Sequence, residues 1–94
     1  LVYMYVIQPH TLKQAKKLGV EVKPSTLLGK KIDVFKDDVK IASVGDTRYS
    51  DYATYMQTHG KSYADERRRL YKIRHNKYRS NPYSNSYYAD KLLW

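Results

Sequence analysis

The side chains best suited to chemistry lie in one stretch of the chain, residues 61–79, called here the basic segment. Eight of the 18 lysines and arginines fall in these nineteen positions, against only Asp65 and Glu66. Guanidinium groups bind carboxylates and phosphates through two parallel hydrogen bonds. The composition therefore indicates a surface that binds an acidic partner, and the alternative is a solvated basic helix face that binds nothing in particular.

Three consecutive arginines, Arg67 to Arg69, mark the middle of the basic segment. Because each helical step turns about 100°, they would cover about 200° of a helix. Arg67 and Arg74 share a helix side with Leu70 and Tyr71. We therefore expect the aliphatic stems of some arginines to pack against the rest of the protein.

Tyrosine is the second distinctive residue type, with 11 copies against one phenylalanine and one tryptophan. Nine of the tyrosines lie at or after Tyr49. Tyrosine, tryptophan and arginine dominate the energetically important positions of protein interfaces. Local packing is the competing explanation for the tyrosines near the chain end. The predicted partner-binding residues are the cations and aromatics Arg67, Arg68, Arg69, Tyr71, Lys72, Arg74, Lys77, Tyr78, Arg79, Tyr83 and Trp94.

Patterns for catalysis or metal binding are missing from the sequence. The chain has no cysteine, which excludes disulfides and thiolate ligands. Its three histidines, His10, His59 and His75, lack a second ligand at metal spacing. There is no G-x-S-x-G motif, and the carboxylates fall mostly at expected turns and helix starts. We therefore predict that the protein is not an enzyme and needs no metal, cofactor or small-molecule substrate.

The formal charge of +9 points to an acidic partner, because such an excess repels itself inside a compact fold. Nucleic acid, an anionic membrane surface or an acidic protein would each fit. No apolar run approaches the ~20 residues that cross a bilayer. Residues 1–7 are apolar but lack a basic start and a cleavage site, so they do not read as a signal peptide.

The elements expected to position these residues form a single domain, 1–94. Residues 1–7 predict a strand, and residues 31–36 and 39–44 predict a hairpin turning at Asp37 and Asp38. Its apolar positions would be Ile32, Val34, Val39 and Ile41. Residues 20–29 are expected to be extended or looped.

Four short helices are expected around this sheet. The first would start at Thr11 with a T-x-x-Q capping box and end at Gly19. Ser50 would cap the second and Ser62 the third, with Asp65 and Glu66 in its first turn. The last would run over residues 87–94. The predicted fold is α+β: a small sheet of N-terminal strand plus hairpin packed with three or four short helices, with a strand, helix and hairpin part at 1–60 and a basic, tyrosine-rich helical part at 61–94.

Several blocks of the chain follow one recognisable pattern. Residues 64–75 read ADERRRLYKIRH, with an R-R-x-x-Y-x-x-R-H block, and residues 86–94 read SYYADKLLW. The middle contains K-P-S-T from Lys23 and D-Y-x-x-Y from Asp51. Over residues 22–94 the chain resembles a family of small basic proteins of giant nucleocytoplasmic DNA viruses of algae and amoebae. It departs from that family at Asn81 and Asn85, where a glycine is common.

The resemblance implies a virion structural protein, made in the cytoplasm of an infected host cell. It implies a minor capsid or cement component that bridges other capsid proteins through the helix at 62–76 and the aromatic chain end. No catalytic residue carries over. The alternative is a nucleic-acid-binding virion protein that contacts packaged DNA through residues 67–79. A regulatory or enzymatic domain delivered into the host is a third possibility.

Overall fold

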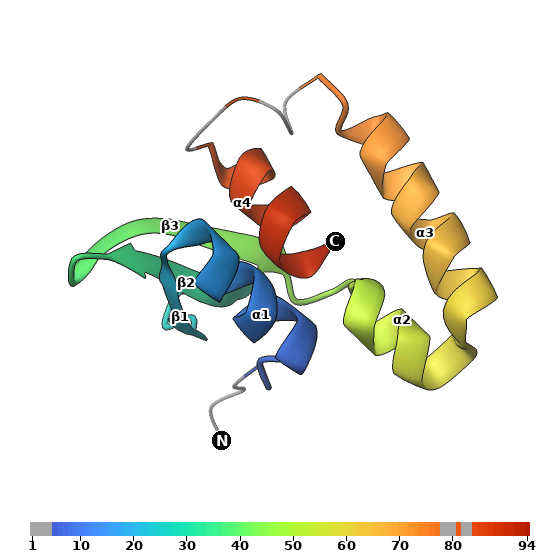
Figure 1. Cartoon of the computed structure of the whole chain (residues 1–94), viewed down its shortest axis with the longest axis horizontal. Coiled ribbons are helices and arrows are strands. Elements are labelled where there is room, and N and C mark those ends of the chain that lie inside the picture. Colours follow the sequence, from blue (N-terminus) through green and yellow to red (C-terminus); the bar gives the residue numbers. More distant parts are fainter. Residues whose placement is uncertain (1–4, 78–80, 82–83) are drawn as a thin grey trace.

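The computed structural model describes residues 5–77, 81 and 84–94. Its elements are α1 (Pro9–Leu18), β1 (Glu21–Pro24), β2 (Lys30–Lys36), β3 (Val39–Asp46), α2 (Tyr52–His59), α3 (Lys61–Arg74) and α4 (Asn85–Leu93). The strands form an antiparallel sheet in the order β1-β2-β3. The helices α1 and α4 lie against the sheet, while α2 and α3 form a helical hairpin to one side of it (Figure 1). The predicted α+β class is confirmed.

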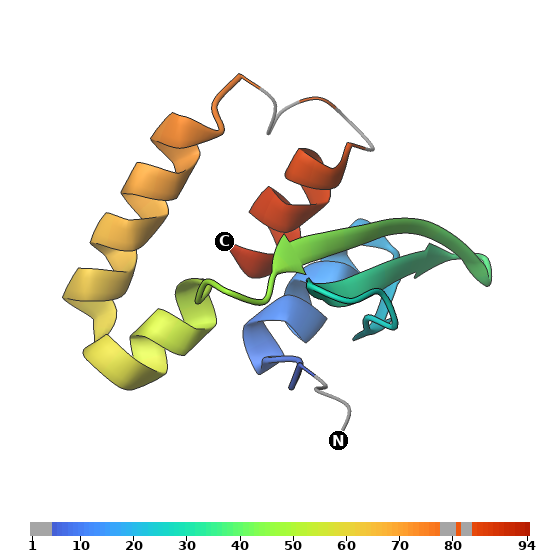
Figure 2. The same cartoon turned by 180° about the vertical axis from the view of Figure 1, so that it is seen from behind.

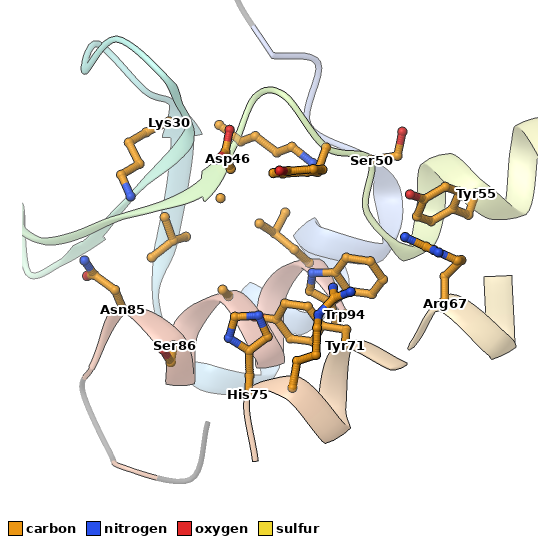
Figure 3. A pocket seen from close by; sticks show the side chains of 17 residues that line it. Lys30, Asp46, Ser50, Tyr55, Arg67, Tyr71, His75, Asn85, Ser86 and Trp94 are labelled. Atoms are coloured by element: carbon orange, nitrogen blue, oxygen red, sulfur yellow. The ribbon is translucent and has the colours of Figure 1, made fainter. Parts of the chain in front are cut away.

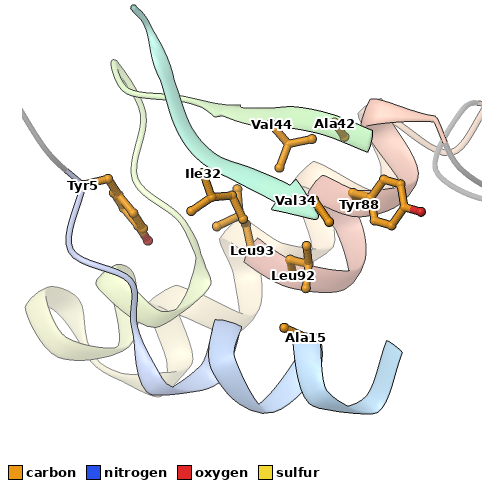
Figure 4. Close-up of a cluster of buried hydrophobic side chains, with 9 residues drawn as sticks. All are labelled: Tyr5, Ala15, Ile32, Val34, Ala42, Val44, Tyr88, Leu92 and Leu93. Carbon is orange, nitrogen blue, oxygen red and sulfur yellow. The ribbon is translucent and has the colours of Figure 1, made fainter. Parts of the chain in front are cut away.

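The core lies between the sheet and the two helices α1 and α4 (Figure 4). Ile32 and Val34 of β2 contribute fully buried side chains, and Leu92 of α4 meets them. The hydroxyl of Thr11 donates to the Leu92 carbonyl at 2.8 Å and ties α1 to α4. The buried cluster comprises Tyr5, Ala15, Ile32, Val34, Ala42, Val44, Tyr88, Leu92 and Leu93.

The predicted hairpin is present as β2 and β3. Asp37 and Asp38 both have positive φ, 51° and 64°, which is the backbone that a tight two-residue hairpin turn requires. A register shift after Val34 pairs Phe35 with Lys40, so β3 carries an extra residue. Ala42 and Val44 consequently face the core. The expectation that Val39 and Ile41 are core positions is wrong, because both are exposed.

The third strand of the sheet is not the one predicted. Residues 1–4 lie outside the described residues, and residues 5–8 have no regular secondary structure. β1 pairs with β2 instead, with Val22 opposite Val34. Tyr5 packs into the core cluster, whereas Val6 is 74% exposed. The apolar composition of residues 1–7 therefore did not predict correctly a strand over residues 5–7, the part of that segment that the structure describes.

Two helices begin earlier than the sequence predicts. α1 starts at Pro9, a residue favoured at the first helical position, and Thr11 lies inside it. α4 starts at Asn85, where the Ser84 hydroxyl accepts from the Tyr87 amide at 3.1 Å. The predicted end of α1 is confirmed, because Gly19 takes the left-handed conformation.

The capping residues of α2 and α3 were also misplaced. Asp51, and not Ser50, caps α2 by accepting from the Thr54 amide at 3.1 Å. α3 begins at Lys61 directly after Gly60, so Ser62 is inside the helix and Asp65 and Glu66 fall in its second turn. Because Gly60 both ends α2 and precedes α3, the two helices join with almost no loop. Figure 2 shows the resulting sharp corner from behind.

Candidate binding surface and cavity

Two of the three consecutive arginines turn toward the protein. The guanidinium carbon of Arg68 lies 3.4 Å from the ring centroid of Tyr52, and that of Arg67 lies 5.6 Å from the ring of Tyr55. Both rings belong to α2, so these cation–π contacts hold the two arms of the helical hairpin together. Arg69 points outward and pairs with Glu66 at 2.6 Å. The spacing argument named Arg67 and Arg74. Arg67 lies inward as expected, Arg74 is exposed, and Arg68, which the argument did not name, also lies inward.

A stack of rings joins α3 to the end of α4. The Tyr71 ring lies 4.4 Å from the Trp94 ring at an angle of 9°, and 4.2 Å from the ring of His75. Lys72 adds an ion pair to Asp90 of α4 at 2.8 Å, and that aspartate side chain is almost fully buried. Burial raises the pKa of Tyr71 to about 12, and the charge of Asp90 adds to the shift. Tyr71 therefore acts as a neutral packing group.

The predicted partner-binding residues divide into three groups in the structure. Five of them make the internal contacts just described: Arg67, Arg68, Tyr71, Lys72 and Trp94. Three are exposed on α3 or just after it: Arg69, Arg74 and Lys77. Tyr78, Arg79 and Tyr83 lie outside the described residues.

The side of α3 that faces away from α2 and α4 is called here the outer face of α3. Its exposed residues at helical spacing are Ser62, Glu66, Arg69 and Ile73, and the exposed Asn76 and Lys77 follow the end of the helix. Ile73 leaves 60% of its surface uncovered. Reasoning from the sequence missed this residue, because it stands inside a block dominated by cations. Its exposure follows from helical spacing once the buried positions Ala64 and Tyr71 are known.

A cavity of about 470 Å³, called here the cationic cavity, lies between α3, α4 and the end of β3 (Figure 3). The predicted residues Arg67, Tyr71, Arg74 and Trp94 line it, and this grouping was not foreseen. Other lining residues come from distant parts of the chain: Lys30, Asp46, Tyr49, Tyr55, His75, Asn85 and Ser86. No spacing rule links these positions in the sequence.

A buried ion pair anchors the start of α2 to the sheet. The Lys31 ammonium lies 3.2 Å from a carboxylate oxygen of Asp51, and both side chains are at most 5% exposed. The hydroxyl of Tyr5 and the amide of Thr54 donate to the same carboxylate. Burial acts to raise the pKa of Asp51, but the charge of Lys31 and these hydrogen bonds outweigh it, and the pKa is lowered. Burial also lowers the pKa of Lys31, against the pull of Asp51.

Comparison of the chain with protein-family models, curated proteins and solved structures gave no match. The viral resemblance therefore stays a prediction. Within residues 5–77, 81 and 84–94, no group of three or more histidine, aspartate or glutamate side chains is placed to hold a metal ion. No helix in the same residues is long and apolar enough to cross a membrane.

Proposed function

We propose that the protein is a binding domain without catalytic activity, which holds an acidic partner protein on the outer face of α3. In the viral setting that the sequence resemblance implies, this is the role of a minor capsid or cement component that bridges capsid proteins. The observation that carries the proposal is the exposure of Ile73 one helical turn from Arg69 on that face, with the exposed Lys77 shortly after the helix.

An exposed isoleucine between cations favours a protein over a nucleic acid as the partner. A phosphate backbone offers charge to Arg69 and Lys77 but no apolar surface to Ile73. A protein interface offers both, because its buried centre is apolar and its rim is polar. The Glu66–Arg69 pair also lowers the positive charge of the face, which weakens attraction to DNA.

The internal contacts of α3 support a binding role for its outer face. Arg67, Arg68, Tyr71 and Lys72 fix the helix from the inner side. A partner therefore meets a helix that is already ordered, and less conformational entropy is lost on binding.

Binding of packaged DNA is the second candidate. It is favoured by the formal charge of +9 and by the exposure of Arg74 and Lys77 near the end of α3. The same cations would then contact DNA phosphates whatever the base sequence of the DNA.

A photo-crosslinking experiment tests the proposal. A photoreactive residue replaces Ile73 in protein produced during infection by the virus that encodes the chain, and the crosslinked products are identified by mass spectrometry. We expect one capsid protein as the dominant product. The matched control replaces Leu12, which is 53% exposed on α1 and lies off the outer face of α3.

Two outcomes of the crosslinking experiment contradict the proposal. One is equal labelling of the same proteins from positions 73 and 12, which would show that contact at Ile73 is not selective. The other is crosslinking of position 73 mainly to DNA, which would favour the second candidate.

A further inference from the structure

We propose that the cationic cavity is a second binding site, which takes an organic phosphate: an oxyanion with two or more negative charges joined to a planar group. The site is distinct from the outer face of α3 and does not depend on the function proposed for that face. The sequence offered no reason to expect a small-molecule ligand.

The charges around the cationic cavity do not balance. Lys30, Arg67 and Arg74 line it, and none of them has an ion-pair partner among the described residues. The lining carboxylate is Asp46, and Arg48 binds it at 2.8 Å. Hydrogen bonds from Arg48 lower the pKa of Asp46 to about 2, so it stays ionised and already paired.

Lys31 and His75, which also line the cavity, do not alter this excess. Lys31 is paired with the buried carboxylate of Asp51. Burial, followed by the charge of Arg74, lowers the pKa of His75, which leaves its imidazole neutral at neutral pH. Three cations without an ion-pair partner among the described residues therefore line one cavity, and a ligand with two or three negative charges would complement them.

One hydrogen-bond donor in the cavity wall lacks an acceptor. The Nε of Arg67 is buried and has no hydrogen-bond partner in the described part of the chain. A buried donor left unsatisfied destabilises a protein. The contact with Tyr55 holds this guanidinium in place at the cavity wall (Figure 3). Because Nε itself is buried, an oxyanion in the cavity would meet this guanidinium group through its charge.

Neutral donors stand at the opposite end of the cavity from Arg67. Figure 3 shows Lys30 together with Asn85 and Ser86, away from Arg67 and Tyr55. Asn85 and Ser86 form the first turn of α4, where helical amide groups also favour negative charge. A phosphate group prefers such a mixture of ammonium, hydroxyl and amide donors.

The size and the aromatic walls of the cavity favour an organic ligand over a simple ion. About 470 Å³ falls within the range of about 300–1,000 Å³ that is usual for small-molecule sites. Tyr71 and Trp94 lie between the two ends of the cavity (Figure 3). The faces of Tyr71 are stacked on Trp94 and His75, so a planar group would pack against the exposed part of the Trp94 ring or the edges of this stack. A nucleoside diphosphate has both required parts.

The test uses adenosine diphosphate as the probe, with the whole chain at ~150 mM salt. Trp94 is the single tryptophan and lines the cavity, so its indole N–H signal in an NMR spectrum reports binding directly. We expect adenosine diphosphate to shift that signal. Adenosine, which lacks the charge, and pyrophosphate, which lacks the planar group, should each bind at least tenfold more weakly.

Charge-neutral variants locate the site. Lys30→Gln and Arg74→Gln should each weaken binding of adenosine diphosphate by about tenfold, a typical loss for one charge-assisted contact. Lys16→Gln, an exposed position on α1, is the matched control and should bind like the unmodified protein. Circular dichroism establishes that each variant is folded.

Several results would overturn the proposal. Adenosine diphosphate that leaves the indole signal unmoved would exclude the cavity as its site, whatever the variants do. An equal loss from Lys16→Gln would show nonspecific attraction to a basic protein. Tighter binding of a hexaglutamate peptide than of adenosine diphosphate would instead assign the cavity to an acidic protein segment.

Discussion

Neighbouring arginines in α3 have different surroundings, although they are identical in type. Arg68 lies over the Tyr52 ring, while Arg69 reaches only the exposed carboxylate of Glu66. Exposed ion pairs contribute little to stability, because water and salt screen them. A cation held against an aromatic ring contributes more, and its stem also covers apolar surface.

A pair of alanine variants tests this difference. Arg68→Ala should lower the free energy of unfolding by about 1–2 kcal/mol, since the cation–π contact and the packing of the stem are both lost. Arg69→Ala should leave it nearly unchanged. Urea denaturation measures both variants, and an equal effect of the two would show that Arg68 does not brace the helical hairpin.

The buried carboxylate of Asp51 governs a second prediction. Its pKa is lowered in the folded protein, so its contribution to stability is complete above the ordinary value near ~4. The contribution is lost as the pH falls through the lowered folded value. Asp51→Asn keeps a side chain that can cap α2 but removes the charge opposite Lys31.

Asp51→Asn should therefore lower the free energy of unfolding at pH 7 by about 3 kcal/mol, because a buried ammonium loses its partner. The variant should also lose less stability than the unmodified protein between pH ~5 and ~2. Asp65→Asn is the control, since its partner Lys61 is exposed. Parallel acid profiles for the unmodified protein and Asp51→Asn would contradict the assigned role of Asp51.

At the scale of the elements, β3 and α4 meet at a glycine. Gly45 has a φ of +86°, and a Cβ there would lie 2.7 Å from Cδ1 of Leu93 and 3.0 Å from Cβ of Lys31. Gly29 has the same φ, yet a Cβ there would meet nothing within 4 Å. Comparing substitutions at the two glycines therefore distinguishes the effect of backbone strain from that of steric contact.

Gly29→Ala should cost about 1 kcal/mol, because alanine is strained at positive φ. Gly45→Ala should cost clearly more, since the buried Leu93 side chain and the Lys31 side chain must also shift. Thermal unfolding of both variants measures the difference. Equal losses would show that the close approach of β3 and α4 is not needed for the fold.

The elements also show which parts of the fold the sequence could predict. The hairpin and the end of α1 at Gly19 follow from local patterns. The starts of the helices were wrong because Thr11 and Ser62 match capping preferences that Pro9 and Gly60 override. The choice between residues 1–7 and β1 as the third strand depends on packing across the whole fold.

In the molecule as a whole, the net charge of +9 is spread over the fold, and only part of it is available to a binding partner. Lys31 and Lys72 are held by buried carboxylates, and Arg68 of α3 packs against the Tyr52 ring of α2. Composition alone predicted a polyanion-binding segment, because it does not tell an arginine that braces the fold from one that faces solvent. The cationic cavity could not be predicted either, since its lining joins positions as distant as Lys30 and Trp94.

We propose that the basic segment serves protein contacts and internal bracing more than binding of nucleic acid. Titration of the protein with duplex DNA at increasing salt tests this proposal. A surface that uses many cations on phosphates loses affinity steeply with salt, with a logarithmic slope near −0.9 for each phosphate neutralised. We expect at most weak binding at ~150 mM salt and a slope of about −3 or shallower. Submicromolar binding at that salt, with a slope of about −6 or steeper, would contradict the account.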